Sequence, residues 1–320
     1  MRATSQIWSY LGSPSGGIVI LVIAMVGISI NDMLIKFLSD EYPLHQMVAT
    51  RSAIGLLFTI MIVKYEGGWA ILRPKRPWLH VVRGLMIVFA NMAYFTALAV
   101  MPLADATALF FVAPLFIVIF SIPVLGEKVG IRRISAVFIG LLGVFVMLRP
   151  GGMNINVPFW VLVLPVASAM AYAMMQVLTR KLGVSSKASA MALYIQVTFI
   201  FVGGCFYLVA GDGRYAQGLE NPSLIFLLRA WVMPPAEDLW LFLLLGCLSA
   251  IIGYCLSQAY RLTDASTLAA YEYVTLPLAV MWGWLIFGSL PGLNTGIGIA
   301  LIMSAGIYVF IRERARKAQT

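Results

Sequence analysis

The sequence is poor in charged residues. Only 11% of its 320 residues are Asp, Glu, Lys or Arg, whereas a soluble domain of this length carries about a quarter. Hydrophobic residues instead make up 61% of the chain. Because so few polar side chains cannot cover a globule in water, the composition excludes a soluble domain and favours a protein that lies in a lipid bilayer.

Histidine and cysteine are also scarce. The chain has two histidines, and its three cysteines, Cys205, Cys247 and Cys255, all lie in apolar runs. We therefore expect neither a disulfide framework nor a metal cluster, and no cofactor. Paired-histidine spacing is absent too, which makes an intramembrane enzyme the least favoured class of function. The first apolar run, 16–38, is too long for the core of a cleavable signal peptide.

Long apolar segments fill most of the chain. A transmembrane helix needs about 20 mostly apolar residues, and ten segments reach or approach that length. They are 16–38, 44–64, 79–100, 104–125, 133–149, 157–179, 189–210, 238–260, 265–287 and 293–311. The predicted fold class is therefore an all-α integral membrane protein with ten transmembrane helices.

The distribution of Lys and Arg predicts the orientation. If the N-terminus lies inside, the inner segments hold most of the 22 basic residues, including Lys64, Arg73, Lys75, Arg76 and Arg83. The outer side keeps Lys36, Arg51, Arg149, Arg214 and Arg229. The positive-inside rule then places both termini in the cytoplasm. The net charge of +9 is an insertion signal under this interpretation, and no nucleic-acid partner is expected.

The chain contains an internal repeat. A shift of 162 superposes Gly84 on Gly246 and 97–126 on 259–288; a shift of 144 superposes Lys36 on Arg180; and a shift of 163 superposes Pro114 on Pro277 and Arg149 on Arg312. Five spans are an odd number, so the second copy must enter the membrane inverted. We expect one repeat over 16–149, a second over 157–311 and a basic cytoplasmic tail over 312–320. Such repeats commonly enclose a substrate site.

One connection, 211–237, is long, and we expect it on the outer side. Its middle, 224–231, is apolar but too short to span the bilayer. The sequence predicts that this segment rests on the membrane interface.

Ionisable residues inside spans are costly and are candidates for function. Asp32, Lys36 and Arg51 lie at one outer level of the first two spans, and Lys36 is one turn from Asp32. They form either a charge network that joins the two helices or a cluster for substrate binding or ion coupling. Snorkelling of the basic side chains is a third interpretation.

Glu272 is the second deep carboxylate, and its neighbours Tyr271 and Tyr273 could bond to it or to a ligand. The alternative is a protonated acid bonded to a neighbouring helix. Further candidates for substrate binding or coupling are the amides Asn91, Gln176 and Gln258 and the aromatic residues Tyr94 and Phe110. Amides inside spans either join helices or line a cavity.

Proline interrupts two corresponding spans. Pro114 and Pro277 lie near the middles of 104–125 and 265–287, and each removes a backbone hydrogen bond and can kink its helix. Corresponding interruptions in the two halves point to a binding site at the membrane midplane.

Several short motifs resemble one family of membrane proteins. They are Pro102-Leu103-Ala104-Asp105-Ala106, Leu125-Gly126-Glu127, Leu178-Thr179-Arg180, Glu272-Tyr273-Val274-Thr275 and Trp282-Gly283-Trp284. Together they resemble the drug/metabolite transporter superfamily, specifically ten-span permeases made of two EamA repeats. The second Gly-Glu of the family is altered here to Gly288-Ser289, which puts any role of that carboxylate in doubt.

The resemblance implies secondary-active transport of a small metabolite across the inner membrane by alternating access. It also implies that helices 1–4 and 6–9 form the cavity and that helices 5 and 10 are peripheral. The substrate class stays open between a vitamin such as riboflavin, S-adenosylmethionine and an amino acid, as do the direction, proton coupling or exchange, and a homodimer. A passive channel or a membrane scaffold is the alternative. The expected partners are the small-molecule substrate and the lipid bilayer.

Overall fold

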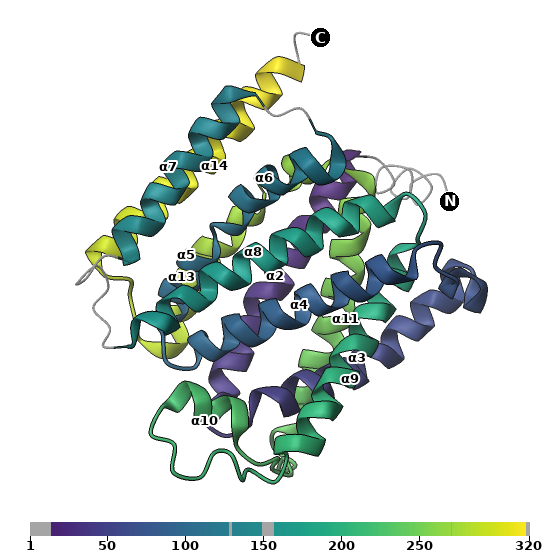
Figure 1. Cartoon of the computed structure of the whole chain (residues 1–320), viewed down its shortest axis with the longest axis vertical. Coiled ribbons are helices and arrows are strands. Elements are labelled where there is room, and N and C mark those ends of the chain that lie inside the picture. The colour runs from purple at the N-terminus through teal and green to yellow at the C-terminus, as the bar shows by residue number, and fades with distance from the viewer. Residues whose placement is uncertain (1–13, 128–129, 149–156, 270, 318–320) are drawn as a thin grey trace.

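The computed structural model describes residues 14–127, 130–148, 157–269 and 271–317. Helices dominate this part of the chain (Figure 1). In chain order they are α2 (Pro14–Leu38), α3 (Leu44–Glu66), the 3₁₀ turn η1 (Gly68–Leu72), α4 (Pro77–Leu98), α5 (Leu103–Phe110), α6 (Ala113–Leu125), α7 (Ile131–Leu148), α8 (Phe159–Gly183), α9 (Ala188–Ala210), α10 (Pro222–Leu228), α11 (Leu239–Leu262), α12 (Ala265–Ala269), the 3₁₀ turn η2 (Glu272–Val274), α13 (Thr275–Phe287) and α14 (Leu293–Lys317). Arg149 and residues 318–320, which the predicted repeats and tail include, lie outside the described residues.

Eight helical segments within the described residues are long and apolar enough to cross a membrane. They are Gly16–Leu38, Leu44–Glu66, Pro77–Leu98, Leu103–Leu125, Phe159–Gly183, Ala188–Ala210, Leu239–Leu262 and Thr267–Phe287. Each coincides with a predicted span, so the prediction of an all-helical membrane protein is confirmed. The other two predicted spans, 133–149 and 293–311, fall on α7 and α14, and the described apolar part of α14 is the shorter Leu293–Ser304.

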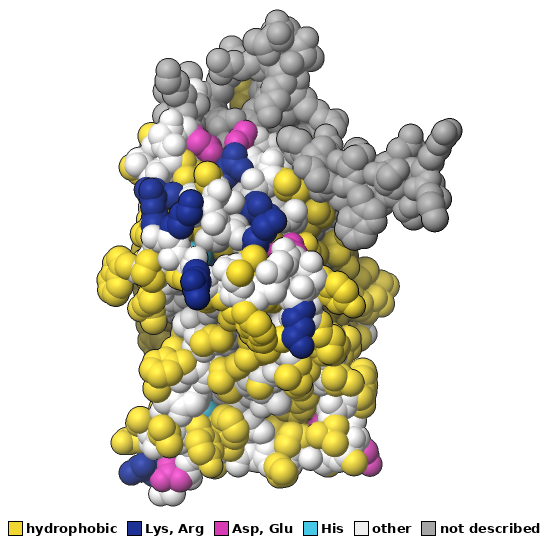
Figure 2. All heavy atoms as spheres, turned by 90° about the vertical axis from the view of Figure 1, so that its right-hand side faces the viewer, with side chains coloured by type: hydrophobic (Ala, Val, Ile, Leu, Met, Phe, Trp, Pro, Cys, Tyr) yellow, Lys and Arg dark blue, Asp and Glu magenta, His cyan; other side chains and the backbone are white. Residues whose placement is uncertain are grey.

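The surface agrees with this assignment. Figure 2 shows hydrophobic side chains over much of one face, while Lys and Arg gather mainly in its upper half and a few charges lie at its lower edge. Phe138, Phe145 and Phe201 are among the large hydrophobic side chains that are more than 60% exposed. Exposed apolar surface on this scale is expected where lipid, rather than water, surrounds the protein.

Two of the spanning segments are interrupted. α5 ends at Phe110 and α6 begins at Ala113, so Pro114 is the second residue of α6. α12 ends at Ala269 and α13 begins at Thr275, so Pro277 is the third residue of α13. Proline is tolerated in the first turn of a helix because the N–H groups there have no helical partner. Each interruption therefore lies about one turn before its proline.

Glycine allows the helices of the main bundle to approach closely. A Cβ atom added at Gly84 of α4 would lie 2.6 Å from Thr198 of α9, and one at Gly246 of α11 would collide with Ile54 of α3. These two glycines are the pair that the internal repeat superposes. Their common role is therefore a close helix crossing, which small residues favour in membranes.

α7 and α14 form a separate pair beside the bundle (Figure 1). They pack on each other along their length and contact the rest through α5 and α6. A Cβ atom at Gly143 of α7 would lie 2.9 Å from the backbone oxygen of Gly298 of α14. Any site at the centre of the protein is therefore formed by the helices of the main bundle and not by α7 and α14.

The connection between α9 and α11 folds back onto the protein. The Asn221 side chain accepts hydrogen bonds from the backbone N–H groups of Ser223 and Leu224 and thereby caps α10. α10 packs on α3 and α4, and Phe226 is only 3% exposed. The prediction that the apolar stretch 224–231 rests on the membrane interface is thus wrong for Phe226, because protein offers this side chain a drier contact than the interface does.

Candidate functional site

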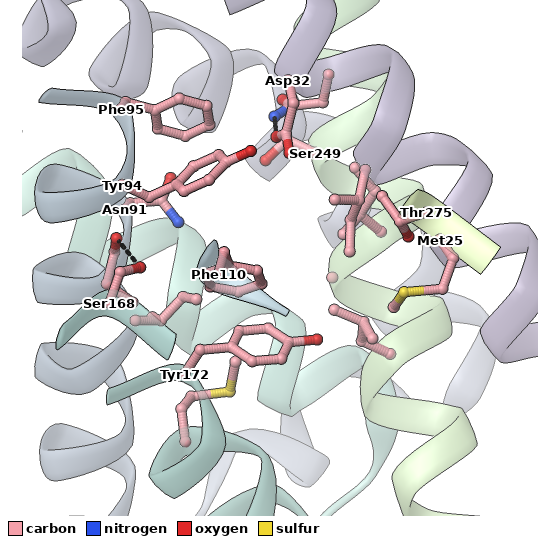
Figure 3. A pocket seen from close by; sticks show the side chains of 18 of the residues that line it. Met25, Asp32, Asn91, Tyr94, Phe95, Phe110, Ser168, Tyr172, Ser249 and Thr275 are labelled. Atoms are coloured by element: carbon pink, nitrogen blue, oxygen red, sulfur yellow. Dashed lines mark hydrogen bonds between the residues drawn. The ribbon is translucent and has the colours of Figure 1, made fainter. Parts of the chain in front are cut away.

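A cavity lies at the centre of the main bundle, between residues from both halves of the chain (Figure 3). Its volume is about 140 Å³. The polar lining residues are Asn31 and Asp32 of α2, Arg51 of α3, Asn91 and Tyr94 of α4, Thr107 of α5, Ser168 and Tyr172 of α8, Ser249 of α11, Glu272 of η2 and Thr275 of α13. The remaining lining residues are mainly aliphatic and aromatic, as in most small-molecule sites.

Arg51 organises one polar group at the cavity wall. Its Nη1 donates to Asn31 Oδ1 at 2.8 Å, and its Nη2 donates to Asn91 Oδ1. Asn31 Nδ2 in turn donates to Asp32 Oδ1 at 3.2 Å. The guanidinium also lies over the rings of Phe95 and Phe199, 5.6 Å from each ring centre. Arg51 and Asp32 are therefore linked through the amide of Asn31.

Lys36 does not belong to this group. Its Nζ donates to the backbone oxygens of Leu98 and Met101, at 2.9 and 2.7 Å, where α4 ends. Among the described residues, neither Lys36 nor Arg51 forms an ion pair with Asp32. The predicted charge network of Asp32, Lys36 and Arg51 is wrong in this respect. The unpaired carbonyls at a helix C-terminus attract a cation strongly, and they belong to a different helix.

Glu272 forms the second polar group. Its Oε1 accepts from the hydroxyl of Tyr172 at 3.1 Å and from the hydroxyl of Tyr260 at 2.7 Å. Gln176 Nε2 donates to the Tyr172 hydroxyl oxygen at 2.6 Å, and this hydrogen bond holds the tyrosine in position toward Glu272. Glu272 itself is 2% exposed. A carboxylate, two phenols and an amide thus form one continuous hydrogen-bonded group.

The tyrosines expected beside Glu272 lie elsewhere. Tyr273 packs its ring against Phe111, with centres 5.7 Å apart, and Tyr271 packs against the hydrophobic core. Neither lines the cavity. The partners of Glu272 come instead from α8 and α11, because consecutive residues of a helical segment point in different directions.

An aromatic wall joins the two polar groups. The ring centres of Tyr94 and Phe110 are 5.2 Å apart, and those of Phe110 and Tyr172 are 5.3 Å apart. The Tyr94 hydroxyl is 2.9 Å from Thr107 Oγ1. Figure 3 shows Met25 on the opposite side of the space from these three rings. The cavity is therefore amphipathic, with polar groups at both ends of an aromatic surface.

The structure separates the predicted site residues into two sets. Asp32, Arg51, Asn91, Tyr94, Phe110 and Glu272 line the cavity, whereas Lys36, Gln176, Gln258, Tyr271, Tyr273, Pro114 and Pro277 do not. Gln258 accepts from Arg261 Nη1 at 2.9 Å near the end of α11. Sequence reasoning did not select Asn31, Thr107, Ser168, Tyr172 or Ser249 as site residues. Tyr172 and Asn31 carried a usable signal, since each is a polar residue inside an apolar span.

Hydrogen bonds from the α9–α11 connection close one end of the bundle. Arg229 donates to the backbone oxygens of the turn between α2 and α3, at 2.5 Å for Asp40 and 2.6 Å for Tyr42, and it also contacts Ser39. Burial lowers the pKa of the Arg229 guanidinium, and the nearby Asp40 and Glu41 oppose that shift. Arg229 therefore fastens the connection to the turn.

Two further contacts strengthen this closure. Gln46 Nε2 donates to Val232 O at 2.6 Å, and Val232 N donates to Gln46 Oε1 at 2.9 Å. The Tyr42 hydroxyl donates to Asp238 Oδ2 at 2.5 Å. Burial, with the Asp238 bond in addition, raises the pKa of the Tyr42 phenol. Tyr42 thus keeps its donor proton at neutral pH.

Arg83 joins four helices at the opposite end of the bundle. It donates to Thr179 Oγ1 at 2.6 Å, Met191 O at 3.0 Å and Ser257 Oγ at 3.2 Å. Arg83 lies inside α4, within the predicted span 79–100, and is 2% exposed. Its three partners on α8, α9 and α11 satisfy the donors that burial would otherwise leave unpaired.

Comparisons with known proteins agree with this architecture. Residues 15–149 match the EamA-like transporter family. The chain is 28% identical over 299 residues to a riboflavin transporter of Rhizobium johnstonii, covering 93% of this chain and 91% of the relative. It is 26% identical over 298 residues to an S-adenosylmethionine uptake transporter of Rickettsia prowazekii, covering 93% of each chain.

A third relative, a pseudopaline exporter of Pseudomonas aeruginosa, is 28% identical over 295 residues, which are 91% of this chain and 94% of the exporter. A solved crystal structure of a protein matches the fold with a TM-score of 0.70 at 20% identity, covering 96% of this chain and 99% of the other. The family match in the first half, the relatives along nearly the whole chain and the membrane helices agree. Residues 15–149 belong to the EamA-like transporter family, and the chain as a whole is a multi-pass membrane protein that is similar to membrane transporters along about nine-tenths of its length.

Proposed function

We propose that this protein is a secondary carrier that moves a small metabolite across the inner membrane by alternating access, and that the central cavity is its substrate site. One observation carries the proposal: the polar groups of the cavity come from both halves of the chain. Arg51 and its amide partners belong to the first half, and Tyr172 and Glu272 belong to the second. Both interrupted segments reach this cavity, through Phe110 and Glu272, as expected of a transporter midplane site.

The packing supports two inverted five-helix repeats, 16–149 and 157–311, with ten spans. In the two repeats, α2 corresponds to α8, and α4 corresponds to α11. The counterpart of the pair α4–α8 is therefore the pair α11–α2, and both pairs pack extensively. The crossings of α4 with α9 and of α11 with α3 exchange in the same way, each through the glycine described above. α7 and α14 exchange with each other and pack as one pair.

Lys36 and Arg180, which the repeat also superposes, have corresponding partners. Lys36 of α2 donates to backbone oxygens where α4 ends. Arg180 of α8 donates to the backbone oxygen of Arg261, at 2.8 Å, and to Asp264, at 2.9 Å, where α11 ends. Lys36 and Arg180 thus make the same kind of contact at corresponding helix ends. This agreement supports a repeat, because a similar composition of the two halves would not by itself place the two side chains in the same way.

The cavity size supports a carrier that changes shape. Ligand pockets typically measure about 300–1,000 Å³, whereas this cavity measures about 140 Å³. A vitamin such as riboflavin, S-adenosylmethionine or an amino acid, the substrate classes that we propose, would therefore need the helices to separate. The hydrogen bonds of Arg229 at one end and of Arg83 at the other are suited to open in turn. By the positive-inside rule, Arg229 faces outward and both termini lie in the cytoplasm.

Counterflow in proteoliposomes tests the proposal. Vesicles are loaded with one unlabelled compound from a panel of riboflavin, S-adenosylmethionine and amino acids, and uptake of the labelled compound is followed. We expect saturable exchange of one class, and an imposed pH gradient shows whether protons are coupled. Asn91→Ala should reduce the exchange, while the control Gln258→Ala, outside the cavity, should not. Non-saturable flux of every compound would indicate a passive channel and contradict the carrier.

A further inference from the structure

The charges around the cavity are not balanced. Arg51 is the one Lys or Arg among the described lining residues, whereas Asp32 and Glu272 are both carboxylic acids. Arg51 is linked to Asp32 through Asn31. Glu272 has only the hydroxyls of Tyr172 and Tyr260 as described hydrogen-bond partners, both on Oε1. An ionised carboxylate in such a place needs a positive partner, because hydroxyl groups alone compensate its desolvation poorly.

The surroundings of Glu272 would suit a cation. The ring of Tyr172, whose hydroxyl reaches Glu272, lies edge to face with Phe110 at 5.3 Å between centres. Tyr94 continues the same wall at 5.2 Å from Phe110. Aromatic faces attract organic cations such as sulfonium and quaternary ammonium, and a nearby carboxylate adds direct attraction. All four side chains line the cavity.

The alternative partner of Glu272 is a protein cation, and no Lys or Arg of the described residues forms an ion pair or hydrogen bond with Glu272. Three described basic residues inside the bundle or at its edge have other hydrogen-bond partners. Lys36 bonds to the end of α4, Arg83 to Thr179 and Ser257, and Arg180 to Asp264. None of the three lines the cavity. Among the described residues, no positive charge complements an ionised Glu272, so such a charge has to come from a ligand.

We propose, on the basis that the cavity is the substrate site, that the transported substrate carries an organic cation which Glu272 receives against the rings of Tyr172 and Phe110. The substrate class is then a sulfonium or ammonium compound, and a neutral ring system such as riboflavin is a poor fit. The cation lies at the Glu272 end of the aromatic wall, and the remaining polar groups of the substrate face Asn91 and Arg51.

Paired compounds that differ in one charge test this proposal. S-adenosylmethionine is compared with S-adenosylhomocysteine, which lacks the sulfonium methyl group and its charge. Choline is compared with its neutral carbon analogue 3,3-dimethylbutan-1-ol, and riboflavin is the uncharged reference. Each compound competes in counterflow and in a thermal-shift assay on the full-length protein in nanodiscs. We expect at least one cation to bind about tenfold or more tightly than its neutral partner, as for a charge-assisted contact.

Glu272→Gln keeps the shape of the side chain and removes its charge, so it should abolish that preference. The matched control is Glu66→Gln. Glu66 also accepts from a tyrosine, Tyr254 at 2.9 Å, and from Ser189 at 2.6 Å, but it does not line the cavity. The control should keep the preference for the cation. If Glu272→Gln fails to fold, Tyr172→Leu should weaken the preference more than Tyr172→Phe, because only leucine removes the ring.

The outcomes separate this proposal from the carrier itself. Saturable exchange of riboflavin, or equal binding of each cation and its neutral partner, would overturn the cationic substrate and leave the carrier intact. A preference that Glu272→Gln does not change would overturn the role of Glu272. Absence of saturable exchange for every compound, with folded protein, would contradict both proposals.

Discussion

Three basic side chains inside the described bundle bond to neutral oxygen atoms. Arg51 bonds to two asparagine amides, Lys36 to two backbone oxygens and Arg83 to two hydroxyls and a backbone oxygen. Such partners fix each cation in place without pairing it to a carboxylate. Neither Asp32 nor Glu272 forms an ion pair with a described Lys or Arg, so both acids remain available to a ligand in the cavity, which is the chemical basis of the proposed substrate site.

At this scale we predict that Lys36→Met lowers stability without lowering substrate affinity. The substitution keeps the length of the side chain but removes the donor to Leu98 O and Met101 O. Leaving buried carbonyl groups unpaired costs about 1–3 kcal/mol, so the melting temperature in detergent should fall. The exposed Lys64 provides a control, and Lys64→Met should have little effect. A loss of affinity at unchanged melting temperature would instead assign Lys36 to substrate binding.

The sequence predicts which polar residues matter better than it predicts their partners. Asp32, Arg51 and Glu272 are selected because charge inside an apolar span is costly, and all three line the cavity. Their partners depend on the packing of distant helices: Tyr172 is 100 residues from Glu272 in the chain. The choice of Tyr271 and Tyr273 fails because adjacency in sequence is not adjacency in space.

At the scale of the element, helix limits follow from apolar length, and close crossings follow from glycine. Span boundaries agree within a few residues, since the bilayer thickness sets how long each apolar run must be. The α10 helix and its contacts could not be predicted in the same way. They depend on Arg229 and Gln46 reaching backbone atoms of distant segments, for which the sequence carries no periodic signal.

Glycine crossings lead to a stability prediction. Gly246→Ala should destabilise the protein by about 1–3 kcal/mol, because the new Cβ collides with Ile54 and the packed helices must move apart. Gly204→Ala in α9 is the matched control: its Cβ would meet nothing within 4 Å. Removing a helical glycine there should be neutral or stabilising by up to about 1 kcal/mol. Equal melting temperatures for the two variants would argue against a tight α11–α3 crossing.

The α9–α11 connection gives a second prediction at this scale. Arg229→Ala removes three donor contacts to the turn between α2 and α3, so α10 should open more often. Amide hydrogen exchange across 222–232 should then rise by about tenfold or more, as expected for the loss of roughly 1.5–3 kcal/mol of charged hydrogen bonding. Arg214→Ala serves as the control, because Arg214 is exposed and pairs only locally with Asp212. Unchanged exchange in both variants would contradict the closing role of Arg229.

At the scale of the whole molecule, the cavity lies between two sets of hydrogen bonds that join distant segments of the chain. Arg229 and Gln46 hold one end, and Arg83 holds the other. The pair α7–α14 lies beside the main bundle, and none of its described residues lines the cavity (Figure 1). Alternating access therefore requires that the same cavity be reached from each side of the membrane in turn.

The most direct test places a single cysteine in the cavity at Ser249, in protein whose three native cysteines are replaced. A membrane-impermeant maleimide is applied from each side of oriented vesicles, with and without the substrate that counterflow identifies. We predict labelling of Ser249→Cys from both sides, with substrate slowing both reactions. Labelling from one side only, while transport continues, would contradict alternating access at this cavity.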